Sequence, residues 1–108
     1  MTIKIFEPGD TLPQLPSELE TFSFEDNDAR FGLKAVEENG QWKWVPATEE
    51  EFRDAEAERL GVSPNDVVMY SSCYQTGPRS CSLGGCWSGG MCRLVYNSAG
   101  NHYYCACM

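Results

Sequence analysis

The sequence lacks any long hydrophobic run and has few basic residues. No stretch approaches the roughly 20 apolar residues that a membrane-spanning helix requires, which argues against a span of that kind. The chain has 8 Lys and Arg against 16 Asp and Glu, a formal net charge of −8. Phosphate binding needs basic residues in excess, so this balance argues against a general nucleic-acid surface. We therefore expect a protein or peptide partner, no nucleic acid and no membrane span; the oligomeric state stays open.

The beginning of the chain also lacks the charged-then-apolar pattern of a secretory signal. Its short apolar run ends at Glu7, Pro8 and Gly9. That absence favours a cytoplasmic location. The six cysteines favour the opposite, because cytosolic thiols stay reduced. We expect a secreted or periplasmic protein if the cysteines are paired, with any signal peptide already removed, and a cytoplasmic protein as the alternative.

Charge and cysteine content divide the chain near residue 70. All 16 acidic residues lie between Glu7 and Asp66, whereas all six cysteines lie beyond Tyr70. Arg79 and Arg93 are the only fixed side-chain charges after Asp66. We predict an α+β fold with an acidic region over residues 1–69, followed by a cysteine-rich, disulfide-stabilised module over residues 70–108.

The acidic region has the pattern of a small antiparallel sheet. Thr2–Phe6 alternates as a short strand does, and Phe22 and Phe24 would share one face of a second strand. The clearest signal is Asn39-Gly40, which suits a type I′ turn because both central residues need a positive φ. We therefore predict a hairpin of residues 31–37 and 41–45, with Trp42 and Trp44 on one face.

One helix follows that hairpin. Thr48 and Glu51 have the spacing of a capping box, and Gly61 follows Leu60 as a stop signal. We expect this helix to pack on the hairpin of residues 31–45. A strand over residues 67–70 then leads into the cysteine-rich module.

The six cysteines are separated by seven, four, five, twelve and one residues, in a run interrupted by glycines. Residues 91–97 and 102–107 predict two strands of a hairpin. Cys105 and Cys107, two residues apart, would then point to the same face, where Cys81 and Cys86 are the natural partners. A piece of this size with few aliphatic residues does not hold a fold by burial alone, which favours three disulfides. The predicted set is Cys73, Cys81, Cys86, Cys92, Cys105 and Cys107, for which 15 pairings exist.

Zinc is the main alternative to disulfides, and no other cofactor is expected. Thiolates at Cys86, Cys92, Cys105 and Cys107 could surround the ion, with His102 replacing one of them. No two cysteines have the two-residue gap that is typical of zinc ribbons and thioredoxin-like redox motifs. Nucleophilic catalysis has little support, because the chain has a single histidine and nothing places it beside a thiol.

Two resemblances concern the C-terminal part. The segment from Gly89-Gly90-Met91-Cys92 to Tyr104-Cys105-Ala106-Cys107 resembles the closing hairpin of cysteine-stabilised αβ defensins, which implies an antimicrobial or toxin-like peptide. Cys81 and Cys86 have four residues between them where that family has three. An acidic leader before a Cys- and Ser-rich end is similar to precursors of ribosomally synthesised, post-translationally modified peptides, with Thr76, Ser80, Ser82 and Ser88 as modification sites.

These observations predict a non-enzymatic cysteine-rich protein. Its acidic region would carry a disulfide-stabilised C-terminal peptide or recognition module; a zinc protein and a modified-peptide precursor are the alternatives. Exposed aromatic side chains supply much of the energy at interfaces. The candidate binding surface is Tyr74, Trp87, Tyr96, Tyr103 and Tyr104.

Overall fold

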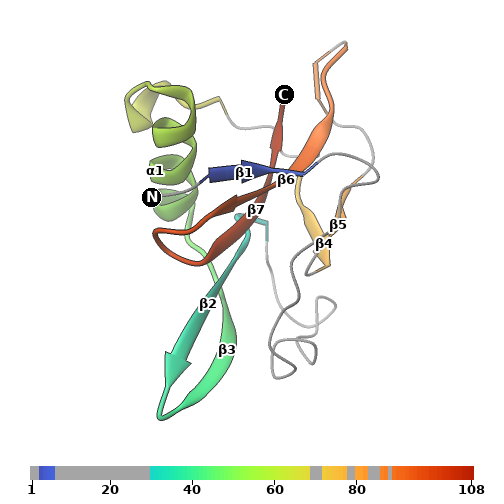
Figure 1. The fold of residues 1–108 in the computed structure, drawn as a ribbon. Coiled ribbons are helices and arrows are strands. Elements are labelled where there is room, and N and C mark those ends of the chain that lie inside the picture. Colours follow the sequence, from blue (N-terminus) through green and yellow to red (C-terminus); the bar gives the residue numbers. More distant parts are fainter. Residues whose placement is uncertain (1–2, 7–29, 69–71, 78–79, 83–85, 88) are drawn as a thin grey trace.

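The computed structural model describes residues 3–6, 30–68, 72–77, 80–82, 86–87 and 89–108. Five strands form one antiparallel sheet in the order β1-β6-β7-β2-β3, and a helix covers one of its faces (Figure 1). The strands are β1 (Ile3–Ile5), β2 (Leu33–Glu38), β3 (Gln41–Pro46), β6 (Cys92–Asn97) and β7 (His102–Cys107). The remaining elements are α1 (Glu49–Leu60), a 3-10 turn η2 (Pro64–Asp66) and a two-stranded sheet of β4 (Gln75–Gly77) and β5 (Ser80–Cys81). The predicted α+β class is confirmed.

The sheet joins the two regions that composition distinguishes. β1 pairs with β6 and β2 pairs with β7, so strands from before residue 70 flank both sides of the C-terminal hairpin. One core cluster contains Leu33 and Trp44 from the first region together with Leu94 and Cys105 from the second. The two regions of different composition therefore contribute strands to one sheet and residues to one core cluster. Release of residues 70–108 as a peptide would break both strand pairings.

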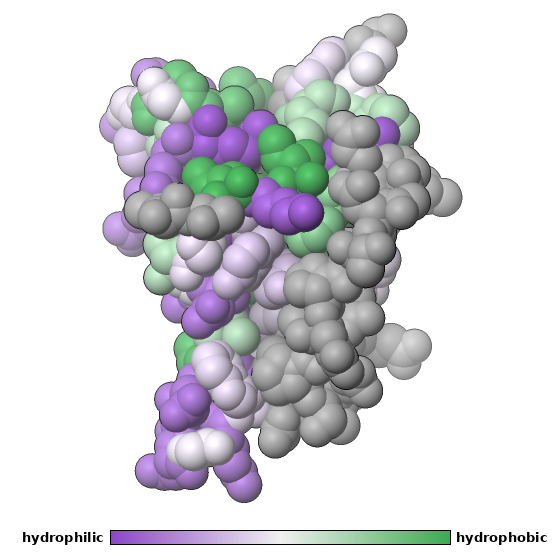
Figure 2. Space-filling model, viewed as in Figure 1, coloured by the Kyte–Doolittle hydropathy of each residue, from purple (hydrophilic) through white to green (hydrophobic). Residues whose placement is uncertain are grey.

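The hairpin around Asn39-Gly40 forms as its sequence predicts. Asn39 has φ of 54° and Gly40 has φ of 81°, the left-handed values that a type I′ turn requires. Trp44 is buried and Trp42 packs against the same core cluster, which places both rings on one face. The hairpin projects from the rest of the sheet in Figure 1, and its tip is hydrophilic in Figure 2.

The helix has the predicted ends, and its main packing partner is the C-terminal hairpin. Thr48 accepts from the Glu51 backbone N–H while the Glu51 carboxylate accepts from the Thr48 N–H, and Gly61 ends the helix with φ of 71°. The ring of Phe52 packs on Tyr104, with 5.2 Å between centroids. Thus α1 packs mainly on β6 and β7 through a second core cluster, and less than expected on the predicted hairpin of residues 31–45. Two contacts with that hairpin are the packing of Phe31 on Phe52, with 6.2 Å between ring centroids, and the ion pair between Lys34 and Glu51.

β7 lies at the centre of the sheet and is covered on both faces. Tyr104 and Ala106 belong to the cluster under α1, whereas Tyr103 and Cys105 belong to the cluster on the opposite face. Gly32 makes this arrangement possible, because a Cβ there would collide with the Tyr103 carbonyl oxygen and its φ is +94°. The chain can therefore approach β7 closely before β2 begins.

Several sequence predictions fall wholly or partly outside the described residues, among them Thr2 of the first strand and the modification site Ser88. The strand containing Phe22 and Phe24 lies wholly outside them. The strand expected over residues 67–70 lies partly outside, and its described residues, Val67 and Val68, follow η2 without strand pairing.

Candidate binding site beside the disulfide cluster

Three disulfides connect the C-terminal hairpin to the loops that precede it. Cys73 pairs with Cys92 with 5.5 Å between Cα atoms, Cys81 with Cys105 at 5.9 Å, and Cys86 with Cys107 at 5.7 Å. Cys105 and Cys107 bind Cys81 and Cys86, the partners that their common face on β7 indicated. The bridges span 19, 24 and 21 residues, loops for which each contributes about 3 kcal/mol by restricting the unfolded chain. Paired cysteines are compatible with an oxidising compartment.

The central bridge, Cys73–Cys92, lies close to each of the other two. The sulfur atoms of Cys73, Cys86 and Cys107 all lie within 4.8 Å of one another, and those of Cys81, Cys92 and Cys105 form a second group with the same spacing. Each group therefore holds one complete bridge and one sulfur of the Cys73–Cys92 bridge, which lies between the other two.

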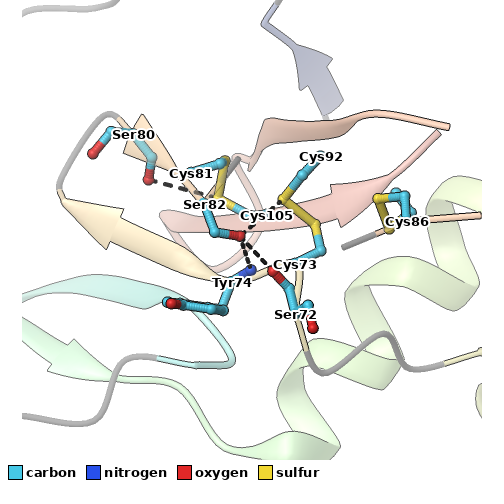
Figure 3. The surroundings of a disulfide bond; sticks show 10 residues. Ser72, Cys73, Tyr74, Ser80, Cys81, Ser82, Cys86, Cys92 and Cys105 are labelled. Atoms are coloured by element: carbon cyan, nitrogen blue, oxygen red, sulfur yellow. Dashed lines mark hydrogen bonds between the residues drawn. A yellow bond between two sulfur atoms is a disulfide. The ribbon is translucent and has the colours of Figure 1, made fainter. Parts of the chain in front are cut away.

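Ser82 anchors the loop beside the central bridge (Figure 3). Its hydroxyl donates to the Ser72 carbonyl at 2.6 Å and accepts from the Tyr74 N–H at 3.1 Å. The same oxygen lies 3.8 Å from Cys92 Sγ. The loop before β4 is thus fixed to the residue after β5 by side-chain contacts at the sulfur cluster.

The zinc set predicted from sequence does not come together as one group. Cys86 and Cys107 belong to one sulfur group, while Cys92 and Cys105 belong to the other. His102 is buried beside neither group; its Nε2 lies 3.0 Å from the Phe31 carbonyl oxygen, to which it can donate. Four thiolates at these positions would have to rearrange to surround one ion, and zinc binding stays a prediction.

The five aromatic residues predicted as a binding surface have different environments. Tyr74 is 41% exposed and Trp87 is 45% exposed. Tyr96 is half-buried and packs on Tyr103, with 4.6 Å between ring centroids. Tyr103 and Tyr104 are buried, so their assignment to a contact surface is wrong. They were misassigned because β7 is covered on both faces, which leaves neither ring toward solvent.

Trp87 forms part of the wall of a cavity of about 550 Å³. The cavity lies between α1 and the last residues of β7, and Phe31, Phe52 and Ala106 line its inner part. Its outer part is lined by Leu60, Val62 and Val68, which are the exposed apolar residues at and after the end of α1. Volumes of 300–1,000 Å³ with mostly apolar walls are usual for ligand sites.

A buried polar network lines the same cavity. The Tyr104 hydroxyl donates to Glu56 Oε1 at 2.9 Å, and Arg59 donates to the two Glu56 carboxylate oxygens at 2.6 and 2.8 Å. Burial, together with the neighbouring Glu56 carboxylate, raises the pKa of Tyr104 far above its ordinary value, so the phenol stays protonated and donates. Sequence reasoning did not single out Glu56; the available signal was an acidic residue on the same helix face as Phe52.

Within the described residues, no strand pairs with the part of β7 beside this cavity. β2 pairs with β7 only at His102 and Tyr103. The Leu94 carbonyl accepts a hydrogen bond from the Phe6 N–H, so the backbone of Leu94 faces β1 and not β7. Leu94 and Cys105 are therefore a non-hydrogen-bonded pair of the β6–β7 ladder, and the N–H and C=O of Cys105 point away from β6. The same alternation applies to Cys107. Both residues therefore direct backbone groups to the side on which β2 pairing has ended.

Comparisons with known proteins give one uncharacterised relative. The chain is similar to the uncharacterized protein YozP of Bacillus subtilis (strain 168), with 28% identity over an alignment of 112 positions that covers 97% of this chain and 93% of that protein. No protein-family model matches the chain. No solved structure matches it. Within the described part of the chain, no helix is long and apolar enough to cross a bilayer.

Proposed function

We propose that this protein is a non-enzymatic recognition protein that binds an extended peptide with apolar side chains at the edge of β7 beside the cavity. The observation that carries the proposal is the meeting of a strand edge and an apolar cavity at Cys105, Ala106 and Cys107. We further propose that it acts as a secreted or periplasmic protein, in keeping with its three disulfides.

The exposed apolar side chains support a binding site at this place. Seven large hydrophobic residues are exposed in the described structure, and four of them line this cavity: Leu60, Val62, Val68 and Trp87. Scattered exposed hydrophobic residues are ordinary, but a gathered set around a hollow is typical of interaction sites. The position of Trp87 is also fixed by Gly90. The Trp87 ring lies against Gly90, and the Trp87 carbonyl accepts a hydrogen bond from the Gly90 N–H at 2.8 Å.

The backbone of β7 favours a peptide over an apolar small molecule. Cys105 and Cys107 turn two N–H groups and two carbonyl groups toward one edge, spaced as a strand partner would need them. Cys107 is partly exposed and Cys105 is buried, so a peptide would reach Cys107 first and must displace the cover of Cys105 to pair with it. A peptide adding as a strand would satisfy these groups and would direct alternate side chains into the cavity. An apolar small molecule could fill the cavity but could not satisfy this edge.

The charged groups nearby favour binding over catalysis. The carboxylate of Glu56 is engaged by Arg59 and Tyr104, which leaves it little freedom to transfer protons. His102 lies in the core against the Phe31 carbonyl. We therefore assign the buried polar network a positioning role: it fixes α1 against β7 and holds the cavity open.

A matched pair of peptide probes tests the proposal. Amide NMR shifts of the oxidised protein would be recorded during titration with the blocked peptide acetyl-Thr-Val-Thr-Val-Thr-amide, and with the same peptide N-methylated on its strand-forming edge. We expect saturable shifts at Cys105 and Cys107 with the first peptide and at least a tenfold weaker affinity with the second, because methylation removes the donors. Equal binding of both peptides, or no shift at β7 at millimolar peptide, would contradict the proposal.

Two serine substitutions separate the cavity from the rest of the surface. Leu60 and Met91 are both 50% exposed, but only Leu60 lines the cavity. We expect Leu60→Ser to weaken the peptide about fivefold, since burial of a partly exposed Leu gives on the order of 1 kcal/mol. Met91→Ser should bind as the unaltered protein does. A larger loss in Met91→Ser would place the peptide elsewhere.

A further inference from the structure

We propose that the three disulfides are one exchange-coupled unit, in which a two-electron reduction that begins at Cys86–Cys107 is passed through Cys73–Cys92 to Cys81–Cys105. The co-reactant that starts the sequence is an external dithiol. This inference is independent of peptide binding and rests on the arrangement of the six sulfur atoms.

The sulfur positions provide a continuous path. Thiol–disulfide exchange requires a thiolate to reach a sulfur of the next bridge. In this cluster Cys73 Sγ lies within 4.8 Å of both sulfurs of the Cys86–Cys107 bridge. Cys92 Sγ, at the other end of the central bridge, has the same relation to Cys81 and Cys105. Disulfides that only join separate loops do not need sulfur atoms of different bridges to lie this close together.

Burial determines where an external dithiol can attack. Cys86 is partly exposed and Cys107 is half-buried with its thiol inside the sulfur group, so a solution reagent reaches this bridge through Cys86. Each of the other two bridges has one buried cysteine, since Cys73 is 7% and Cys105 is 1% exposed. Attack should therefore begin at Cys86–Cys107, where the dithiol is oxidised to its disulfide and the protein gains two thiols.

The first internal step consumes one of these thiols as a thiolate. The thiolate of Cys86 or Cys107 attacks Cys73 Sγ, a new bridge to Cys73 forms, and the Cys73–Cys92 bond breaks with release of the Cys92 thiolate. The number of disulfides in the protein stays at two. The Ser82 hydroxyl, 3.8 Å from Cys92 Sγ, can turn from the Ser72 carbonyl to stabilise the departing thiolate (Figure 3).

The second step moves the free thiol to the far end of the cluster. The Cys92 thiolate attacks Cys81 or Cys105, forms a bridge to one of them and releases the other as a thiolate that takes up a proton. The two-electron-reduced protein then contains two bridges that the oxidised protein lacks: Cys73 to Cys86 or Cys107, and Cys92 to Cys81 or Cys105. One thiol remains at each end of the cluster.

A pH-jump experiment on the whole oxidised protein separates the first attack from the relay. One equivalent of tris(2-carboxyethyl)phosphine at pH 3 reduces an accessible bridge while exchange is slow, because the thiols are protonated. The sample is raised to pH 8, quenched with acid at intervals and alkylated with N-ethylmaleimide, and its linkages are mapped by mass spectrometry. We expect label on Cys86 and Cys107 before the jump. After it, label should appear on Cys81 or Cys105 together with the two new bridges.

Confinement of the label to Cys86 and Cys107 after the jump would overturn the proposal, as would first labelling at another bridge. A double variant, Cys73→Ser with Cys92→Ser, removes the central bridge and should confine the label to Cys86 and Cys107 at all times. If that variant does not fold, Ser82→Ala serves instead and should slow the appearance of label at Cys81 or Cys105 about threefold, the effect of one weak hydrogen bond. An unchanged rate in Ser82→Ala would contradict the relay through Cys92.

Discussion

Glu56 and Tyr104 show how single polar groups fix the helix on the sheet. Tyr104 is fully buried, and its hydroxyl donates to the carboxylate of Glu56, a residue that is only 4% exposed. A buried charge is costly unless it is paired and hydrogen-bonded, and Arg59 supplies the pairing. The phenol adds a third donor to the same carboxylate. Replacing Glu56, Arg59 or Tyr104 should therefore leave a buried polar group of this network without one of its hydrogen-bond partners.

Tyr104→Phe should lower the free energy of unfolding by about 1.5 kcal/mol, the usual loss when a hydrogen bond to a charged group is removed. The ring packing on Phe52 is retained in this variant. Guanidinium denaturation of the oxidised protein measures the change, and Tyr74→Phe is the control because Tyr74 is exposed. A loss no larger than that of Tyr74→Phe would show that the hydrogen bond from Tyr104 to Glu56 contributes nothing to stability.

His102 gives the fold a defined response to pH. Burial lowers the pKa of His102 below its ordinary value of 6.5. Between the two pKa values the unfolded chain binds the proton more strongly than the folded protein does. The stabilisation that comes from a neutral His102 in the folded protein is thus fully present above pH 6.5. It is lost as the pH falls from 6.5 to the lower pKa of the folded protein, and stability does not change further through His102 below that pKa.

The unfolding free energy should therefore decrease from pH 7 to pH 5. His102→Gln should remove this decrease, because His102 is the single histidine in the chain. Denaturation curves at half-unit pH intervals provide the measurement. If the unfolding free energy of His102→Gln fell equally steeply with decreasing pH, the titration would belong to another group.

At the scale of elements, local chemistry determined what could be predicted. The hairpin at Asn39-Gly40 and both ends of α1 depend on residues close in sequence, so their signals are complete within a few positions. The C-terminal hairpin was predictable for the same reason. The main packing partner of α1 was not, because Phe52 contacts Tyr104, 52 residues away.

The capping box should be worth a measurable part of the helix stability. Thr48→Ala removes the side-chain acceptor of the Glu51 N–H and should cost about 1 kcal/mol in unfolding free energy. Thr48→Ser keeps the acceptor and should cost only a few tenths of that amount. Thermal unfolding followed by circular dichroism compares them. Equal losses in the two variants would attribute the effect of Thr48 to its methyl group.

At the scale of the whole molecule, the strand order shows the limit of the sequence prediction. The pairings of β1 with β6 and of β2 with β7 join residues more than 60 positions apart, and no short pattern encodes them. The cavity depends on where these pairings stop, so it could not be predicted either. One signal was present: residues 102–107 form a nearly continuous apolar run, which is typical of a strand buried on both faces.

The shared sheet predicts that residues 70–108 do not fold alone. Without β1 and β2 the C-terminal hairpin loses a neighbour on each side, and α1 no longer covers Tyr104. The isolated peptide, oxidised in a glutathione buffer, should give several disulfide isomers and poorly dispersed amide NMR signals. The full chain under the same conditions is the control. A single isomer with dispersed signals would restore an independent C-terminal module.

Disulfide mapping of the full oxidised chain tests the central claim most directly, because the sheet, the cavity and the sulfur relay all depend on how the cysteines are joined. Proteolysis at acidic pH without reductant, followed by mass spectrometry, identifies the linked peptides. We predict the bridges Cys73–Cys92, Cys81–Cys105 and Cys86–Cys107 and no free thiol. Any other pairing, or thiols that are free or bound to a metal in the folded protein, would contradict the account.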